Sequence, residues 1–162
     1  MGNYLKMQRV SSTLNIPDYR YQLSRFCRKS FAQIAELRKG GKVFWIDSDV
    51  VLKAKVEAKF LKNCLKNTYL CYMGRIGFNV CTSFVGWDAD HPDNVRFTDA
   101  YEDIYLSEKV LDLSEWHDGF VFDVVRRQTA VESKNLSPKA EGTVNIFDRV
   151  FPFGHHKKGN LK

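Results

Sequence analysis

The segment Val43-Phe44-Trp45-Ile46-Asp47-Ser48-Asp49 decides the fold that the sequence predicts. Four apolar residues follow a pair of glycines and one lysine, and they stop at an acidic residue. A short, continuous apolar run with such boundaries indicates a β-strand that is buried on both faces. Asp47 and Asp49 then lie at the carboxyl end of this strand, which is where ligands of open α/β sheets bind. We therefore expect a functional site beside these two carboxylates.

The segments around this strand alternate between helix and strand patterns. Apolar residues recur at the spacing of an amphipathic helix in four segments, residues 19–37, 56–65, 93–106 and 115–127. Gly40-Gly41 is expected to end the first of these helices, and Ser114 to cap the last. Strands are expected at residues 69–73 and 81–87. The alternation predicts a layered α/β domain with a mixed sheet.

The whole chain, residues 1–162, is expected to form this one domain. Turn-forming residues make residues 1–18 a lead-in, and residues 19–128 form the α/β core. Prolines and glycines make residues 129–162 a loop-rich tail, with one short strand or turn at residues 144–147.

The composition indicates a folded, basic protein. Of its 162 residues 44% are hydrophobic, which is enough for a core, and the net charge of +6 favours an anionic partner. That partner can be a nucleotide, a nucleic acid or an acidic surface. No stretch approaches the roughly 18 to 20 apolar residues of a membrane helix, so we expect a cytoplasmic protein without a membrane partner. The four scattered cysteines are expected to be buried thiols.

The pair Asp47 and Asp49 is suited to a divalent metal ion. Two carboxylates one residue apart can reach the same hard cation, Mn²⁺ or Mg²⁺. Such a cation bridges the two phosphates of a nucleoside-diphosphate sugar and neutralises the departing diphosphate. The same pattern also occurs in ordinary surface turns.

A second group of candidate residues closes the chain. His156 can complete the coordination of manganese, since a neutral imidazole binds this metal together with carboxylates. Lys158, Gly159 and Lys162 are candidate contacts of the diphosphate, because lysine carries positive charge and glycine lets the backbone approach phosphate. The alternative is a basic tail without a ligand.

A third group lies in the segment Glu115-Trp116-His117-Asp118, at the start of a predicted helix. Asp118 can accept hydrogen bonds from sugar hydroxyl groups, and His117 is the next candidate for a catalytic residue. A helix-capping aspartate is the structural alternative.

Taken together, the Asp-Ser-Asp strand, Phe84-Val85-Gly86-Trp87, the Glu115–Asp118 segment and the closing His-x-x-Gly-x-x-Lys resemble the GT-A glycosyltransferases. The similarity covers residues 19–162 and is greatest to the glycogenin and bacterial galactosyltransferase group and to short proteins of bacteria and phages. It implies a truncated, Rossmann-like GT-A fold, with manganese held by Asp47, Asp49 and His156. It also implies that Lys162 contacts the donor diphosphate and that Asp118 lies near the transferred sugar.

The chain departs from this family pattern before Asp47, where only 46 residues precede the aspartate. We therefore expect the N-terminal nucleotide-binding portion of the family to be missing. A second copy of the chain or a partner subunit is then expected to complete the site.

The leading hypothesis for function is a metal-dependent transferase that moves a sugar from a UDP-type donor to an acceptor hydroxyl. A nucleic acid is one candidate acceptor. The alternative is a non-catalytic binding protein derived from the GT-A fold, encoded by a phage and acting on nucleic acid or a host factor. Aromatic residues beside basic ones, as in Tyr19-Arg20-Tyr21 and Phe26-Cys27-Arg28-Lys29, are compatible with that alternative.

Overall fold

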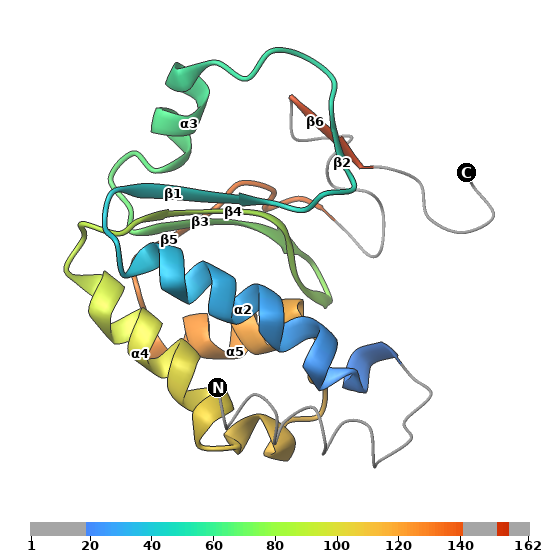
Figure 1. Cartoon of the computed structure of the whole chain (residues 1–162). Helices are drawn as coiled ribbons and strands as arrows, with labels where there is room; N and C mark the ends of the chain where they lie inside the picture. Colours follow the sequence, from blue (N-terminus) through green and yellow to red (C-terminus); the bar gives the residue numbers. More distant parts are fainter. Residues whose placement is uncertain (1–18, 141–151, 156–162) are drawn as a thin grey trace. The chain divides into compact units, whose positions relative to one another are not determined.

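A computed structural model of the chain describes residues 19–140 and 152–155 (Figure 1). The structure is mixed α/β and contains a mixed sheet, as the sequence predicts. The described residues divide into two compact units. The helical unit contains residues 19–41 and 89–131, and the sheet unit contains residues 42–88, 132–140 and 152–155. No helix in the described part of the chain is long and apolar enough to cross a membrane.

The helical unit is built from three α-helices that pack against one another. Its elements are the 3-10 turn η1 (Tyr19–Tyr21), α2 (Leu23–Leu37), α4 (Asp93–Leu106), the 3-10 turn η2 (Lys109–Asp112) and α5 (Asp118–Thr129). Aromatic rings join α4 to α5, with the Phe122 ring 5.8 Å from Phe97 and 6.2 Å from Tyr101. Phe31 of α2 lies 5.6 Å from Tyr105 of α4. The spacing of apolar residues predicts a helix in each of these three segments, and the ring contacts show which helices pack together.

The helix α2 ends at Leu37 with Arg38 as its C-cap residue, so Gly40 and Gly41 lie beyond the cap that they were expected to form. Both residues have positive φ values, +82° and +81°, which L side chains rarely adopt. The Asp90 carboxylate accepts a hydrogen bond from the Gly41 N–H at 2.8 Å, and a Cβ on Gly40 would lie 2.9 Å from the same oxygen. Glycine is therefore needed here for both conformation and space.

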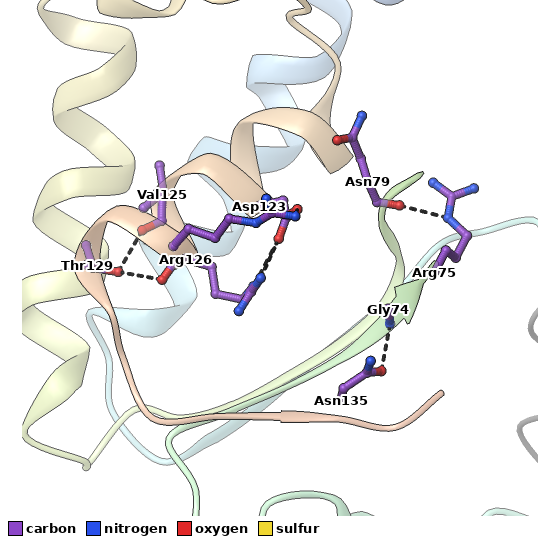
Figure 2. Close-up of polar contacts among 9 residues, drawn as sticks. Gly74, Arg75, Asn79, Asp123, Val125, Arg126, Thr129 and Asn135 are labelled. Atoms are coloured by element: carbon purple, nitrogen blue, oxygen red, sulfur yellow. Dashed lines mark hydrogen bonds and ion pairs between the residues drawn. The ribbon is translucent and has the colours of Figure 1, made fainter. Parts of the chain in front are cut away.

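The start of α5 differs from the prediction. His117, and not Ser114, is the N-cap residue, because its Nδ1 accepts a hydrogen bond from the Phe120 N–H at 3.3 Å. Within the helix, Asp123 is almost fully buried and pairs with Arg126 and Arg127, each at 2.7 Å. Figure 2 shows the contact with Arg126. The two arginines compensate the buried charge.

The sheet unit contains a four-stranded sheet, a two-stranded sheet and one short helix. In chain order its elements are β1 (Lys42–Ile46), β2 (Val50–Leu52), α3 (Ala58–Cys64), β3 (Leu70–Arg75), β4 (Phe78–Asp88), β5 (Ser133–Asn135) and β6 (Phe153–His155). The order in the larger sheet is β1-β4-β3-β5, and β2 pairs with β6. Only the β3–β5 pair is parallel within the larger sheet.

The prediction that β1 is buried on both faces was wrong. Among the described residues β1 lies at the edge of the sheet, pairs only with β4 and runs antiparallel to it. Its central residues are half-buried, and Ile46 is 41% exposed. A continuous apolar run indicates a strand buried on both faces only in parallel sheets, and β1 is antiparallel to its neighbour. The run alone does not distinguish a central strand from an edge strand with one covered face.

One face of the sheet packs on α3 and β6 in an aromatic core. Phe84 of β4 is fully buried, and its ring lies 5.9 Å from Phe44, 6.5 Å from Phe60 and 4.6 Å from Phe153. The buried members of this cluster are Cys64, Leu65, Cys71, Met73, Phe84, Ala140 and Phe153. Cys64 and Cys71 belong to this cluster, Cys81 packs against it, and Cys27 is buried in α2. The expectation of buried thiols is therefore confirmed for three cysteines, whereas Cys81 is half-buried.

The tail after Thr129 contributes two strands that the sequence did not predict, β5 and β6. Asn135 fixes the end of β5, because its side-chain oxygen accepts hydrogen bonds from the N–H groups of Gly74 and Ser137 at 2.9 Å each. Figure 2 shows the contact between Asn135 and Gly74. The strand or turn predicted at residues 144–147 lies outside the described residues.

Candidate functional site

The Asp-Ser-Asp segment forms a tight turn directly after β1. The Asp47 N–H donates to the Ser83 carbonyl at 2.9 Å, which continues the β1–β4 ladder by one residue. The Val50 N–H then donates to the Asp47 carbonyl at 3.1 Å and closes the turn into β2. Asp47 and Asp49 are half-buried. Both carboxylates therefore lie on one short turn whose two ends are fixed by strands.

Trp45 holds the first of these carboxylates. Its indole N–H donates to Asp47 Oδ1 at 2.7 Å. Side chains two residues apart on a strand lie on the same face, which brings the indole within reach of the carboxylate. The spacing of Trp45 and Asp47 is the one signal in the sequence that points to this contact. The hydrogen bond orients the carboxylate.

The pairing of β2 with β6 brings a distant segment to this turn. Val50, the residue after Asp49, is the partner of His155, and Leu52 is the partner of Phe153. The two strands come from opposite ends of the sheet unit's sequence and lie side by side in Figure 1. Phe153 anchors β6, since its buried ring contacts Phe84 and lies 5.7 Å from Phe60.

The remaining predicted residues of this site, His156, Lys158, Gly159 and Lys162, lie outside the described residues. Within residues 19–140 and 152–155, no group of three or more His, Cys, Asp or Glu side chains is arranged to hold a metal ion. The structure thus places two carboxylates at the turn. Carboxylate oxygens are ligands that Mn²⁺ and Mg²⁺ accept, so the donors that are present fit such a cation in kind.

Asp118, the predicted sugar-binding residue, belongs to the helical unit and pairs with a residue that the sequence reasoning missed. Lys29 of α2 lies 2.7 Å from Asp118 Oδ2, and both side chains are largely buried, at 14% and 16% exposure. Asp118 is the first residue of α5, where the helix dipole favours a negative charge. The alternative prediction of a capping aspartate was wrong, because His117 is the cap.

His117 uses both ring nitrogens within the helical unit. Nδ1 accepts from the Phe120 N–H, so the proton of the neutral ring resides on Nε2, which lies 2.9 Å from Glu115 Oε2. Glu115 also pairs with Arg20 at 3.2 Å. These contacts give His117 a structural role at the start of α5, and acid–base chemistry at this ring requires breaking one of them.

A buried hydroxyl cluster lies in the same unit as the Lys29–Asp118 pair. Ser30 Oγ lies 2.8 Å from the Tyr101 hydroxyl and 2.9 Å from the Tyr105 hydroxyl. Burial raises the pKa of both tyrosines, and the negative charge of Asp118 raises it further. The hydroxyl groups therefore stay protonated at neutral pH and remain available as hydrogen-bond donors.

Two glycines of the sheet unit and two aromatic residues of the helical unit have structural roles. A Cβ on Gly86 would collide with the Phe44 ring, and Gly77 has a φ of +76° in the β3–β4 turn. In the segments where aromatic and basic residues alternate, Tyr21 packs edge-on against Trp116 at 5.4 Å. Phe26 is half-buried and lies 6.2 Å from the His117 ring. These two half-buried rings thus pack against other rings of the helical unit.

The structure thus gives two candidate groups, the Asp47–Asp49 turn with β6 in the sheet unit and the Lys29–Asp118 pair in the helical unit. Comparison of the chain with models of protein families, with curated proteins and with solved structures finds no match.

Proposed function

We propose that the chain is a metal-dependent glycosyltransferase, or the catalytic half of one, which transfers a sugar from a UDP-type donor to an acceptor hydroxyl. The observation that carries the proposal is the pairing of β2 with β6. It joins the strand that begins one residue after Asp49 to the strand that ends one residue before His156. These are the two segments in which the sequence predicts ligands of the same metal ion.

Chain connectivity extends this argument by one residue. Consecutive Cα atoms are about 3.8 Å apart, so His156 is tethered at that distance from His155, the partner of Val50. Asp49 is tethered in the same way to Val50. Asp49 and His156 thus each adjoin one member of the Val50–His155 pair in the sequence.

The chemistry of the proposed site follows from its residues. Asp47, oriented by Trp45, and Asp49 supply negative charge at a fixed turn. A bound divalent cation supplies Lewis-acid neutralisation of the leaving diphosphate. Lys158, Gly159 and Lys162 are proposed contacts of that diphosphate. The GT-A fold is part of the proposal, and it is supported by the mixed sheet and by the aspartate pair at the end of a strand.

A direct test is the release of UDP from UDP-sugars. Incubated with UDP-glucose, UDP-galactose or UDP-N-acetylglucosamine, the protein is expected to release free UDP with Mn²⁺ and not with EDTA, since water replaces the acceptor at a low rate. GDP-mannose serves as the control for the base. If the protein releases UDP from none of these donors in the presence of Mn²⁺, the transferase proposal is wrong.

Asp118 is proposed to position the reacting sugar, and Lys29 to hold Asp118 in place. Asp118→Asn is expected to lower the turnover number about 10- to 100-fold and to leave the affinity for UDP nearly unchanged, because a positioning group acts mainly on the transition state. Donor turnover and UDP titration measure the two effects separately. Lys29→Gln is also expected to lower the turnover number, by a smaller factor than Asp118→Asn.

The matched control for Asp118→Asn is Glu115→Gln, which removes a carboxylate from the same segment. Thermal unfolding must accompany both variants, because Asp118→Asn removes the ion pair between Asp118 and the largely buried Lys29. The double variant with Lys29→Gln and Asp118→Asn tests whether restoring charge balance restores stability without restoring turnover. If Glu115→Gln lowers turnover equally, the positioning role of Asp118 is wrong.

A further inference from the structure

The outer surface of α3 carries a concentration of positive charge that the proposed site does not use. Residues 53–66 contain five lysines and one glutamate, a net charge of 5 − 1 = +4. Lys59, Lys62 and Lys66 are all exposed. We call these three residues the lysine face.

Helix geometry explains why two of the three lysines share a side. Residues three or four apart lie on the same face of an α-helix, so Lys59 and Lys62 are neighbours on α3. Lys66 lies in the turn directly after the helix, where its N–H donates to the Asn63 carbonyl at 3.4 Å. The opposite side of α3 packs into the sheet unit's core through Phe60, Leu61 and Cys64.

A fourth lysine from another strand extends the positive charge. Lys134 of β5 is exposed, and its ammonium group donates to the Asn63 carbonyl at 2.7 Å. This contact places a cation at the C-terminal end of α3, where the helix dipole favours it. The lysine face therefore ends beside a cation that comes from a separate part of the chain.

The lysine face differs from the basic residues of the helical unit. Arg38, Lys39 and Lys109 each pair with a carboxylate, at 2.6, 2.6 and 2.7 Å. None of Lys59, Lys62 and Lys66 has an acidic partner among the residues that the structure describes. The single glutamate of this stretch, Glu57, lies 3.4 Å from Lys55. Like charges at helical spacing repel one another, and here no carboxylate offsets the repulsion.

We propose that the lysine face binds the phosphate backbone of nucleic acid without reading its sequence. A nucleic acid duplex carries a negative charge about every 1.7 Å along its axis, and neutralising its phosphates releases condensed counterions. The lysine face offers two cations on a helix of seven residues and a third in the turn after it, together with Lys134. This binding surface is independent of the proposed sugar transfer.

Two features favour nucleic acid over an anionic membrane. Helices that bind a membrane surface insert an apolar face between the lipids. The apolar side of α3 is already used in the protein core, with Cys64 buried and Phe60 and Leu61 packed against the cluster. What remains at the surface of the helix is positive charge, which suits a partner with a high density of phosphates.

The test measures binding of a fluorescein-labelled 25-base-pair DNA duplex of arbitrary sequence by fluorescence anisotropy, from 50 to 200 mM salt and without metal or sugar nucleotide. The wild-type protein is expected to bind with an affinity that falls steeply with salt. The variant with Lys59→Gln, Lys62→Gln and Lys66→Gln is expected to lose at least about 10-fold in affinity at 50 mM salt. Its slope of log affinity against log salt is expected to be less steep by about 2.7, or about 0.9 for each lost phosphate contact.

The matched control carries Arg38→Gln, Lys39→Gln and Lys109→Gln, which changes the net charge by the same amount. It is expected to keep the wild-type slope, and circular dichroism checks that both variants are folded. Equal losses in the two variants would show that net charge alone drives binding and would overturn the proposal. Absence of DNA binding by the wild-type protein, or binding to phosphatidylserine vesicles in its place, would also overturn it.

Discussion

Replacing Asp47 and Asp49 together by asparagine is expected to lower metal-dependent UDP binding by about 100-fold or more, because affinity at such sites depends on the number of charged ligands. Asparagine keeps the size of the side chain, and its amide oxygen can still accept the hydrogen bond from Trp45. The variant therefore removes two negative charges while keeping the shape of the turn. Isothermal titration of UDP with and without Mn²⁺ measures the effect.

The matched control is a variant with Asp88→Asn and Glu132→Gln, which removes two negative charges from the same unit. Asp88 pairs with Lys42 at the opposite end of β1 from the aspartate turn. This control is expected to keep the metal-dependent affinity for UDP. An aspartate-turn variant that binds as tightly as the wild-type protein, or a control that loses as much, would show that the metal site lies elsewhere.

Phe84→Ala is expected to destabilise the sheet unit by about 3 to 5 kcal/mol, which is typical of phenylalanine-to-alanine changes in a core. The ring is fully buried and contacts three other aromatic rings, those of Phe44, Phe60 and Phe153. For a chain of this size the loss corresponds to a fall of roughly 6 to 20 °C in the unfolding midpoint. Differential scanning calorimetry measures this change.

The control for this second prediction is Phe78→Ala in the same strand. Phe78 is 49% exposed, and its main aromatic contact is with the Arg75 guanidinium at 5.8 Å from the ring centre. Its removal is expected to change the stability by less than about 1 kcal/mol. Comparable losses from Phe78→Ala and Phe84→Ala would contradict the aromatic core around Phe84.

Local patterns in the sequence were sufficient to predict most of the helices. The period of apolar residues in α2 and α4 is regular, and four residues that follow it, Cys27, Ile34, Tyr101 and Tyr105, are buried. The start of α5 was placed three residues too early, because Ser114 is a common capping residue and histidine is not. Only the hydrogen bond from Phe120 to the His117 ring identifies the cap.

Long-range pairing could not be predicted from local patterns. β5 has the sequence Ser133-Lys134-Asn135, which lacks the apolar and β-branched residues of a strand. Its position depends on pairing with β3 and on the contact of Asn135 with Gly74. The edge position of β1 likewise depends on which strands pair, and the residues of β1 alone do not specify it.

The candidate site was predicted in part. The placement of Asp47 and Asp49 directly after a strand was correct, whereas the hydrogen bond from Trp45 and the ion pair between Lys29 and Asp118 were missed. Lys29 lies in a helix far from Asp118 in the sequence, so no spacing rule connects the two. The pairing of Val50 with His155 could not be predicted either, because it joins distant segments and accompanies the burial of Phe153 in the core.

The central claim is that a metal ion binds between the aspartate turn and the strand that leads to His156. It is tested most directly by paramagnetic broadening of backbone amide signals in the ¹⁵N-labelled protein with UDP and Mn²⁺, with Mg²⁺ as the diamagnetic reference. The account predicts that the amides of Ser48, Val50 and His155 are broadened together, and that the effect disappears in the variant with Asp47→Asn and Asp49→Asn. Broadening that spares either Val50 or His155, or that persists in this variant, would contradict it.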